Sequence, residues 1–397
     1  MGFLRKNTKG IRVPPVLRLV ASIVLVANLS CSHLKIERPL RQSAADWPAF
    51  GRSVARTNSS AETIAPPLSL VWTHDITGGF GSGSPLVIDS LVLVGNLRGE
   101  LYALNARTGQ RKGWIDLCDA INGSPVVEGG VVYVCGSNTE ESLIAFDMVQ
   151  GKSIWKKPYG DIEVSPLLLE DRLYFGNIRG EFFCVNKRTG EKLWKFDIPE
   201  NTKLKGIRSS AVADHGAVIF GADDGYMYAL ETETGKLRWS YDTGSPIVAP
   251  PAAQHGALFI GNISGAFLCL NAENGTLLWS YSCGTSILAG AAVSNSNVLV
   301  ATAGGSVVSL RPEDGVAQWR SELGSVINAS PVIAGEYIYV GTLKKTLHGI
   351  RLTDGELVFS HTVSGRIKSS PAIAYRRLYV ASDDRLIMAF VGADEGQ

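Results

Sequence analysis

Charged residues are scarce in this sequence, and several common functional motifs are missing. Only 19% of the 397 residues are charged and the formal net charge is +1, so the chain lacks the general basic surface of nucleic-acid-binding proteins. The 6 histidines form no HExxH motif, and no Gly-x-Ser-x-Gly elbow or phosphate loop occurs where a strand runs into a helix. Sustained helical periodicity is absent too, which disfavours helical and βαβ folds. Glycine is abundant at 43 residues but has no Gly-X-Y period, which excludes collagen and indicates many tight turns.

The cysteines show no metal-binding or redox spacing. Five follow Cys31 and none forms a CxxC pair, so one disulfide among them stays open and its pairing cannot be assigned from the sequence. Cys184 and Cys269 recur at the same place in two repeats, so we expect small buried residues there. The five are Cys118, Cys135, Cys184, Cys269 and Cys283.

The first 30 residues are typical of an export signal. They carry five basic residues and no acidic one, and an apolar run over 19–29 precedes Ser30 and Cys31. This run is shorter than the roughly 20 residues that a membrane span needs. The tetrad Asn28-Leu29-Ser30-Cys31 resembles a bacterial lipobox, with Asn28 as its one departure. We therefore expect a lipoprotein-type signal peptide over 1–30 and lipidation of Cys31; a plain signal peptide or an uncleaved anchor are the alternatives. Without residues 1–30 the chain carries a net charge of about −4, which further disfavours nucleic acid as a partner.

A repeat of about forty residues organises the chain after residue 68. Its closing aromatic residues recur every 39 to 45 residues, and each repeat holds several short apolar runs bounded by turn residues. This period is typical of four-stranded propeller blades. A glycine also recurs in the third turn of each repeat, as expected where the backbone needs a positive φ. The aromatic residues are Trp72, Trp114, Trp155, Trp194, Trp239, Trp279, Trp319 and Phe359, and the glycines are Gly109, Gly151, Gly190, Gly235, Gly275, Gly315 and Gly355.

Counting the repeats predicts the architecture. Seven are complete, and the eighth stops before its fourth strand, which the segment 69–73 can supply. We expect an all-β, eight-bladed β-propeller of four-stranded antiparallel blades over 66–391, closed by an N-terminal strand that completes the last blade. A seven-bladed ring with a stray half repeat is the alternative. Residues 31–65 are expected to be a tether leading into the ring, and 392–397 a C-terminal tail.

The repeat resembles the tryptophan-docking motif of quinoprotein (PQQ-like) β-propellers. Val185-Asn186-Lys187-Arg188-Thr189-Gly190 followed by Trp194 carries the resemblance, and the stretch ending at Trp239 repeats it. The resemblance implies that the indole of one blade packs on the glycine turn of the next. Three departures are local: one extra residue before Trp114, Gln150 in place of Thr, and Phe359 in place of Trp.

The layout of a lipobox-like start and eight blades is similar to that of the lipoprotein family of the bacterial outer-membrane β-barrel assembly machine. Ser32 after Cys31 favours sorting to the outer membrane, and Trp47–Arg52 is similar to what precedes the first blade in many exported PQQ-repeat proteins. The resemblance implies a non-catalytic scaffold on the periplasmic side of the outer membrane, with a lipid anchor, envelope proteins as partners, and no cofactor. We expect it to be monomeric outside its complex.

Two other functions stay open. A PQQ-dependent dehydrogenase needs a cation such as Ca²⁺ and often carries a disulfide between adjacent cysteines, but this sequence has no Cys-Cys pair and its repeats are too uniform to wall a substrate chamber. A periplasmic propeller that binds a small molecule is the third interpretation. No catalytic, cofactor-binding or metal-binding residue is predicted, since His215, His255 and the pairs at 223–224 and 383–384 occupy repeated turns.

The mouth of the central channel supplies the candidate binding residues. Propellers place the start of each inner strand around this channel, and polar residues stand just before several Ser-Pro positions. These side chains could grip a peptide or an edge strand, or satisfy one another around ordered water. The candidates are Asn122, Glu163, Arg208, Asn328 and Lys368.

Overall fold

The computed structural model describes residues 33–199 and 204–393. The expected signal peptide, the lipidation residue Cys31 and tail residues 394–397 lie outside these ranges. Every regular element within them is a β-strand, and they contain no helix long and apolar enough to cross a membrane.

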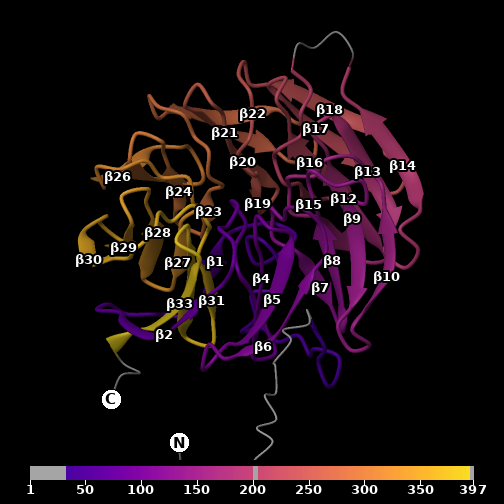
Figure 1. Cartoon of the computed structure of the whole chain (residues 1–397). Coiled ribbons are helices and arrows are strands. Elements are labelled where there is room, and N and C mark those ends of the chain that lie inside the picture. Colours follow the sequence, from indigo (N-terminus) through magenta and orange to yellow (C-terminus); the bar gives the residue numbers. More distant parts are fainter. Residues whose placement is uncertain (1–32, 200–203, 394–397) are drawn as a thin grey trace, which may run out of the picture. The chain divides into compact units, whose positions relative to one another are not determined.

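The predicted eight-bladed propeller is confirmed. Eight blades of four antiparallel strands follow one another in chain order around a ring, from indigo to yellow in Figure 1, and one of the eight sheets has a short fifth strand. Within a blade the two middle strands are almost wholly buried, whereas the outermost strand alternates exposed and buried residues. This pattern is expected where middle strands have a neighbouring blade on both faces and outer strands meet solvent.

From inner to outer strand, blade 1 contains β3 (Leu86–Ile88), β4 (Leu91–Gly95), β5 (Glu100–Asn105) and β6 (Arg111–Asp116), and blade 2 contains β7 (Val126–Glu128), β8 (Val131–Cys135), β9 (Leu143–Asp147) and β10 (Lys152–Lys157). Blade 3 contains β11 (Leu167–Leu169), β12 (Arg172–Gly176), β13 (Glu181–Asn186) and β14 (Lys192–Asp197), and blade 4 contains β15 (Val212–Asp214), β16 (Ala217–Gly221), β17 (Tyr226–Glu231) and β18 (Leu237–Asp242).

In the same order, blade 5 contains β19 (Ala252–Gln254), β20 (Ala257–Gly261), β21 (Ala266–Asn271) and β22 (Leu277–Ser282), and blade 6 contains β23 (Ala292–Val293), β24 (Val298–Ala301), β25 (Ser306–Leu310) and β26 (Ala317–Glu322). Blade 7 contains β27 (Val332–Ala334), β28 (Tyr337–Gly341), β29 (Thr346–Arg351) and β30 (Leu357–Thr362), and blade 8 contains β31 (Ala372–Ala374), β32 (Arg377–Ser382), β33 (Leu386–Val391) and β2 (Ser69–Asp75).

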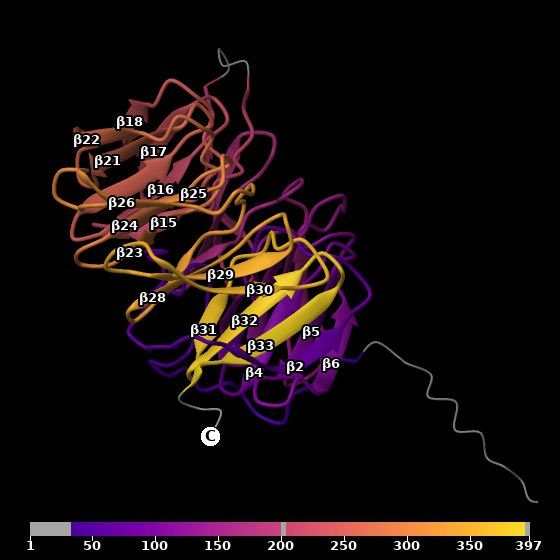
Figure 2. The same ribbon diagram turned by 90° about the vertical axis from the view of Figure 1, so that its left-hand side faces the viewer.

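The ring closes in blade 8, where the two ends of the repeat region meet. Strand β2, from the N-terminal side, pairs antiparallel with β33, the last strand in the described residues, so that Trp72 lies opposite Ala389. Figure 2 shows indigo β2 beside the yellow strands of this blade. The closing strand that the sequence predicts is thus in place, and β33 has a paired strand on both of its sides.

The hydrophobic core lies between neighbouring sheets. One cluster, for example, joins Leu167 and Phe182 of blade 3 to Val218 and Phe220 of blade 4, and the rings of Phe182 and Phe220 stack 4.1 Å apart. A short hairpin joins each inner strand to the next strand of the same blade. His215 and His255 occupy two such turns with φ near +50°, so a repeated turn accounts for both histidines.

Residues 33–65, expected as a tether, lie on the ring in two defined parts. The N-terminal strap (residues 33–40) crosses blades 1 and 2, where Ile36 N donates to Met148 O at 2.8 Å. The axial plug (residues 47–60) follows, and its last residues form β1 (Ser59–Ser60), which pairs parallel with inner strand β27. Trp47 and Leu34 are fully buried, so both parts belong to the folded domain.

Candidate functional site

A belt of serine hydroxyls holds the inner strands around the central channel. The N–H of Ser84 donates to Ser124 Oγ at 2.7 Å, and the N–H of Ser124 donates to Ser165 Oγ at 2.8 Å. The same bond joins Ser165 to Ser210 and Ser330 to Ser370. Each of these serines, which stand just before inner strands, is therefore a link between blades and fixes where the residues just before it lie.

Three of the five candidate mouth residues are held by their own blades. Asn122 Nδ2 donates to Ser137 Oγ at 2.7 Å, Arg208 Nε donates to Asp223 Oδ2 at 3.0 Å, and Lys368 Nζ lies 2.8 Å from Asp383 Oδ2. Each partner sits in the turn between the two middle strands of the same blade. Asp223 and Asp383 thus anchor the cations at the mouth.

The other two candidates line the axial cavity without such support. Among the described residues the Glu163 carboxylate has no ion pair or hydrogen bond, and Asn328 Oδ1 is buried without a partner. Both groups face the narrow cavity at the channel mouth, together with Arg208. The cavity offers about 40 Å³ to water, room for one or two molecules.

The axial plug closes the far end of this cavity. Phe50 forms the floor, and successive plug carbonyls accept hydrogen bonds from the inner strands of blades 4 to 7. The donors and acceptors are Ala213 N to Val54 O, Ala253 N to Ala55 O, Val293 N to Thr57 O and Ile333 N to Asn58 O. The plug therefore ties four blades together across the axis and leaves the mouth as the open end of the cavity.

Arg56 is the centre of the plug, although nothing in the sequence distinguishes it from exposed arginines. Its side chain is fully buried and donates to the carbonyl oxygens of Ala211 (2.6 Å), Phe50 (3.1 Å) and Ser165 (3.2 Å). The guanidinium carbon lies 5.3 Å from the centre of the Phe50 ring. Burial without a carboxylate lowers the pKa of Arg56 to about 9, so the group is charged at neutral pH and three carbonyl dipoles offset its desolvation.

Six tryptophans dock on the glycine turn of the next blade. A Cβ on each of these glycines would lie 2.4 to 2.7 Å from the indole, and all six glycines have a positive φ. Each indole N–H also donates to a carbonyl of that turn, at 2.8 to 3.2 Å, which the sequence does not reveal. The docked pairs are Trp72–Gly109, Trp155–Gly190, Trp194–Gly235, Trp239–Gly275, Trp279–Gly315 and Trp319–Gly355.

Trp114 does not dock on Gly151. The extra residue in blade 1 places Gly113 where the other blades have tryptophan, opposite Ala103, and Trp114 stacks on Tyr102 with ring centres 6.0 Å apart. The strap occupies the vacated position, because a Cβ on Gly113 would meet Leu34 Cα at 3.0 Å and one on Gly151 would meet Leu34 O at 3.4 Å. An N-terminal leucine thus replaces an indole in the joint between blades 1 and 2.

Phe359 also departs from the docked pattern, for a different reason. Blade 8 draws its last two strands from opposite ends of the chain, so no hairpin joins them. Gly392 instead packs against Ala65 at this join, and the Phe359 ring stacks parallel to His361. The smaller aromatic residue stands where there is no glycine turn to dock on.

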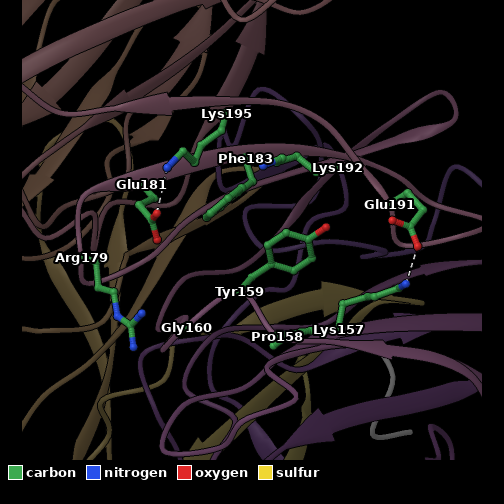
Figure 3. A pocket seen from close by; sticks show the side chains of 10 residues that line it. All are labelled: Lys157, Pro158, Tyr159, Gly160, Arg179, Glu181, Phe183, Glu191, Lys192 and Lys195. Carbon is green, nitrogen blue, oxygen red and sulfur yellow. Dashed lines mark hydrogen bonds and ion pairs between the residues drawn. The ribbon is translucent and has the colours of Figure 1, made fainter.

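A second polar hollow is an open notch between blades 2 and 3 on the rim. It encloses about 460 Å³ and is lined by Lys157, Tyr159, Arg179, Glu181 and Lys195 among others. Figure 3 shows Tyr159 across its centre, with Lys157 paired to Glu191 on one side and Lys195 paired to Glu181 at 3.1 Å on the other. The Tyr159 hydroxyl donates to Gly190 O at 2.7 Å, and burial raises the pKa of this phenol to about 12.

The axial cavity does not fit the quinone that this kind of propeller suggests. Its roughly 40 Å³ is far below the 300–1,000 Å³ usual for cofactor and ligand pockets, and Phe50 and Arg56 fill the axis below it. Within residues 33–199 and 204–393 no group of three or more His, Cys, Asp or Glu side chains could hold a metal ion. Asp223 and Asp383 at the mouth are already engaged by cations, which leaves Glu163 as the single described carboxylate lining the cavity.

Comparison with known proteins identifies the family. The family profile described as outer membrane protein assembly factor BamB matches residues 69–196, 184–329 and 303–397. The chain belongs to this family. The BamB of Legionella pneumophila (strain Paris) is 30% identical over 169 residues, which are 39% of this chain and 42% of that protein. The quinohemoprotein alcohol dehydrogenase of Comamonas testosteroni is 26% identical over 185 residues, 39% of this chain and 26% of that enzyme.

Solved structures agree on the fold. The crystal structure of BamB from Moraxella catarrhalis superimposes with a TM-score of 0.70 and 20% identity, covering 82% of this chain and 99% of that one. The Comamonas testosteroni quinohemoprotein alcohol dehydrogenase gives a TM-score of 0.72 at 17% identity, covering 87% of this chain and 80% of the enzyme. Sequence matches span about two fifths of the BamB relatives' length. This chain is therefore similar to proteins of two kinds, BamB assembly factors and quinohemoprotein alcohol dehydrogenases.

Proposed function

We propose that this chain is a non-catalytic scaffold of the cell envelope, held by a lipid on Cys31 at the periplasmic side of the outer membrane, where it docks proteins of the β-barrel assembly machinery. The observation that carries the proposal is the filled axis. Arg56 and Phe50 occupy the channel below the mouth, so this ring has no central chamber in which a quinone and a substrate could meet.

The mouth supports docking of a protein partner. Its cations are fixed by Asp223 and Asp383, which provides a rigid frame, while the Glu163 carboxylate has no partner among the described side chains. Leu97 and Ile178 occupy the turns of blades 1 and 3 that correspond to the turns of Asp223 and Asp383, and each is 40% exposed. Apolar side chains around a few fixed charges are typical of protein interfaces.

The test is cross-linking in cells of the lipidated protein with a photoreactive residue at position 163. We expect a component of the assembly machinery to be captured, and the same residue at the outer-rim position Glu313, which is exposed, to capture none. Equal capture of the machinery from both positions, or capture of no envelope protein from position 163, would contradict docking at the mouth. Mass spectrometry of the purified protein separately reports whether Cys31 carries lipid.

A second candidate, binding of a small anionic molecule, is favoured by the notch between blades 2 and 3. Its volume lies in the range of ligand pockets, and Arg179 and Lys192 have no ion pair within the described part of the chain. Ligand-induced thermal stabilisation that is lost in Arg179→Ala would support this function. A redox-active complex formed with PQQ and Ca²⁺ would overturn the scaffold proposal.

A further inference from the structure

The N-terminal strap begins between the outer strands of blades 1 and 2, at a place called the corner below. The N–H of Trp114 donates to His33 O at 3.2 Å, and Leu40 N donates to Gly129 O at 3.0 Å. Leu34, between these bonds, is 1% exposed. The chain is therefore fixed to outer strand β6 at residue 33 and to the inner hairpin of blade 2 at residue 40.

Little chain separates this corner from the proposed lipid. Cys31 precedes His33 by two residues, and two residues span at most about 7 Å. The lipid on Cys31 belongs to the proposed function, and the present inference rests on it. A lipid held so close to a folded domain brings that part of the domain to the membrane surface.

Three lysines surround the point where the strap begins. Lys35, on the strap, and Lys112, on β6, line one surface groove beside the strap. Lys152 follows Gly151, whose Cβ position is 3.6 Å from Lys35 Cβ. All three side chains are exposed, and none makes an ion pair with a described residue, whereas Arg38 in the same groove is paired with Asp89. The groove also holds the carboxylate of Glu37.

These lysines stand out against the charge of the whole protein. The chain after residue 30 carries a net charge of about −4, so it has no overall attraction to an anionic surface. A cluster of cations beside a lipid chain is the combination that gives firm and oriented membrane attachment, because each contributes a separate interaction with the bilayer.

We propose that the corner formed by the strap and by the outer strands of blades 1 and 2 rests on anionic phospholipid headgroups through Lys35, Lys112 and Lys152. The propeller then stands on its rim, with blade 5, across the ring, directed away from the membrane. The channel mouth is left accessible from the side. This orientation places a partner at the mouth beside the membrane and not between the propeller and the lipid.

The experiment measures which side of the ring faces the bilayer. The lipidated full-length mature protein is placed in vesicles of phosphatidylglycerol and phosphatidylcholine, with a fluorophore on Ser153→Cys (β10) or on Ser280→Cys (β22). Both serines are exposed on outer strands, and the five described native cysteines are buried or half-buried. Quenchers attached to lipid headgroups should quench the label at position 153 at least threefold more than the label at position 280.

Two charge variants test the role of the lysines. Replacing Lys35, Lys112 and Lys152 by glutamine should lower the ratio of quenching at 153 to that at 280 toward one, as should neutral phosphatidylcholine vesicles. The control replaces three exposed lysines elsewhere, Lys192, Lys236 and Lys344, by glutamine and should keep the ratio. Equal quenching at the two positions, or the same loss in both variants, would overturn the inference.

The result separates this inference from the proposed function. Lipid on Cys31 together with equal quenching would reject the membrane-facing corner and leave the scaffold intact. Absence of lipid on Cys31, seen by mass spectrometry, would remove the anchor on which both depend.

Discussion

Trp194 lies directly over Gly235 of the next blade, so that a Cβ on this glycine would fall 2.6 Å from Cδ2 and Cε3 of the indole. The indole N–H meanwhile donates to Thr232 O at 3.0 Å. The glycine turn and the indole are therefore matched in shape and in hydrogen bonding. Because the same relationship recurs at six joints, the ring is held by a repeated contact between blades as well as by the core.

We expect Gly235→Ala to destabilise the protein by about 2–4 kcal/mol, since it combines a strained positive φ with a clash against the indole. Gly244→Ala is the matched control, because Gly244 has φ +76 and nothing within 4 Å of its Cβ position. Urea unfolding should show a loss of only about 1 kcal/mol there. Equal losses in both variants would show that the contact with the indole adds nothing to the backbone strain.

Trp194→Phe should cost about 1–2 kcal/mol more than Trp114→Phe. The first change removes the hydrogen bond to the partly buried carbonyl of Thr232 and the packing on Gly235, whereas Trp114 stacks on Tyr102 and its indole N–H has no partner among the described residues. The comparison is made by urea unfolding of the two variants. Equal destabilisation would contradict the special position of Trp114.

Arg56→Met should destabilise the ring by about 2–3 kcal/mol, because three carbonyl oxygens, one in the plug and two beside the inner strands of blades 3 and 4, lose their donor. Arg107→Met is the control, as Arg107 is exposed and surface changes usually stay within about 0.5 kcal/mol. Hydrogen exchange should also quicken at the plug-bonded amides of Ala213 and Ala253. An Arg56→Met variant as stable and as protected as the parent would show that the plug does not depend on the guanidinium.

The five cysteines after Cys31 should resist thiol reagents at pH 8 in the folded protein. Burial raises the pKa of Cys118 to about 12 and that of Cys283 to about 11, so the reactive thiolate is almost absent in the folded state. All five thiols are free in the structure. Reaction with a chromogenic disulfide reagent should therefore report five thiols only after denaturation, and three would reveal one disulfide.

The repeat made the ring predictable, because blade number, closure by residues 69–73 and the glycine turns all follow from local patterns that recur. The path of residues 33–60 was not predictable in the same way, since it occurs once and has no second copy for comparison. Leu34 and Trp47 are apolar residues in a segment expected to be a tether, and only the structure shows what they cover.

Two residues show the physical limit of the sequence. Arg56 is a charged side chain, and charged side chains are rarely fully buried, so composition indicates the wrong environment for it. Trp114 follows a one-residue insertion, and a shift of one residue along a strand turns a side chain to the other face. The sequence shows the insertion, but not that a leucine from the N-terminal strap takes the place of the indole between blades 1 and 2.

Blade 8 also sets the order in which the protein can be completed. Among the strands of the eight described blades, β2 is the first to be synthesised, yet its partner β33 is the last. Seven blades can form one after another behind the growing end, but the eighth waits for the whole chain. A chain cut short before residue 386 would keep β2 without its neighbour and expose a strand edge that recruits other chains, so incomplete copies should be found in aggregates or proteolytic fragments and not among folded molecules.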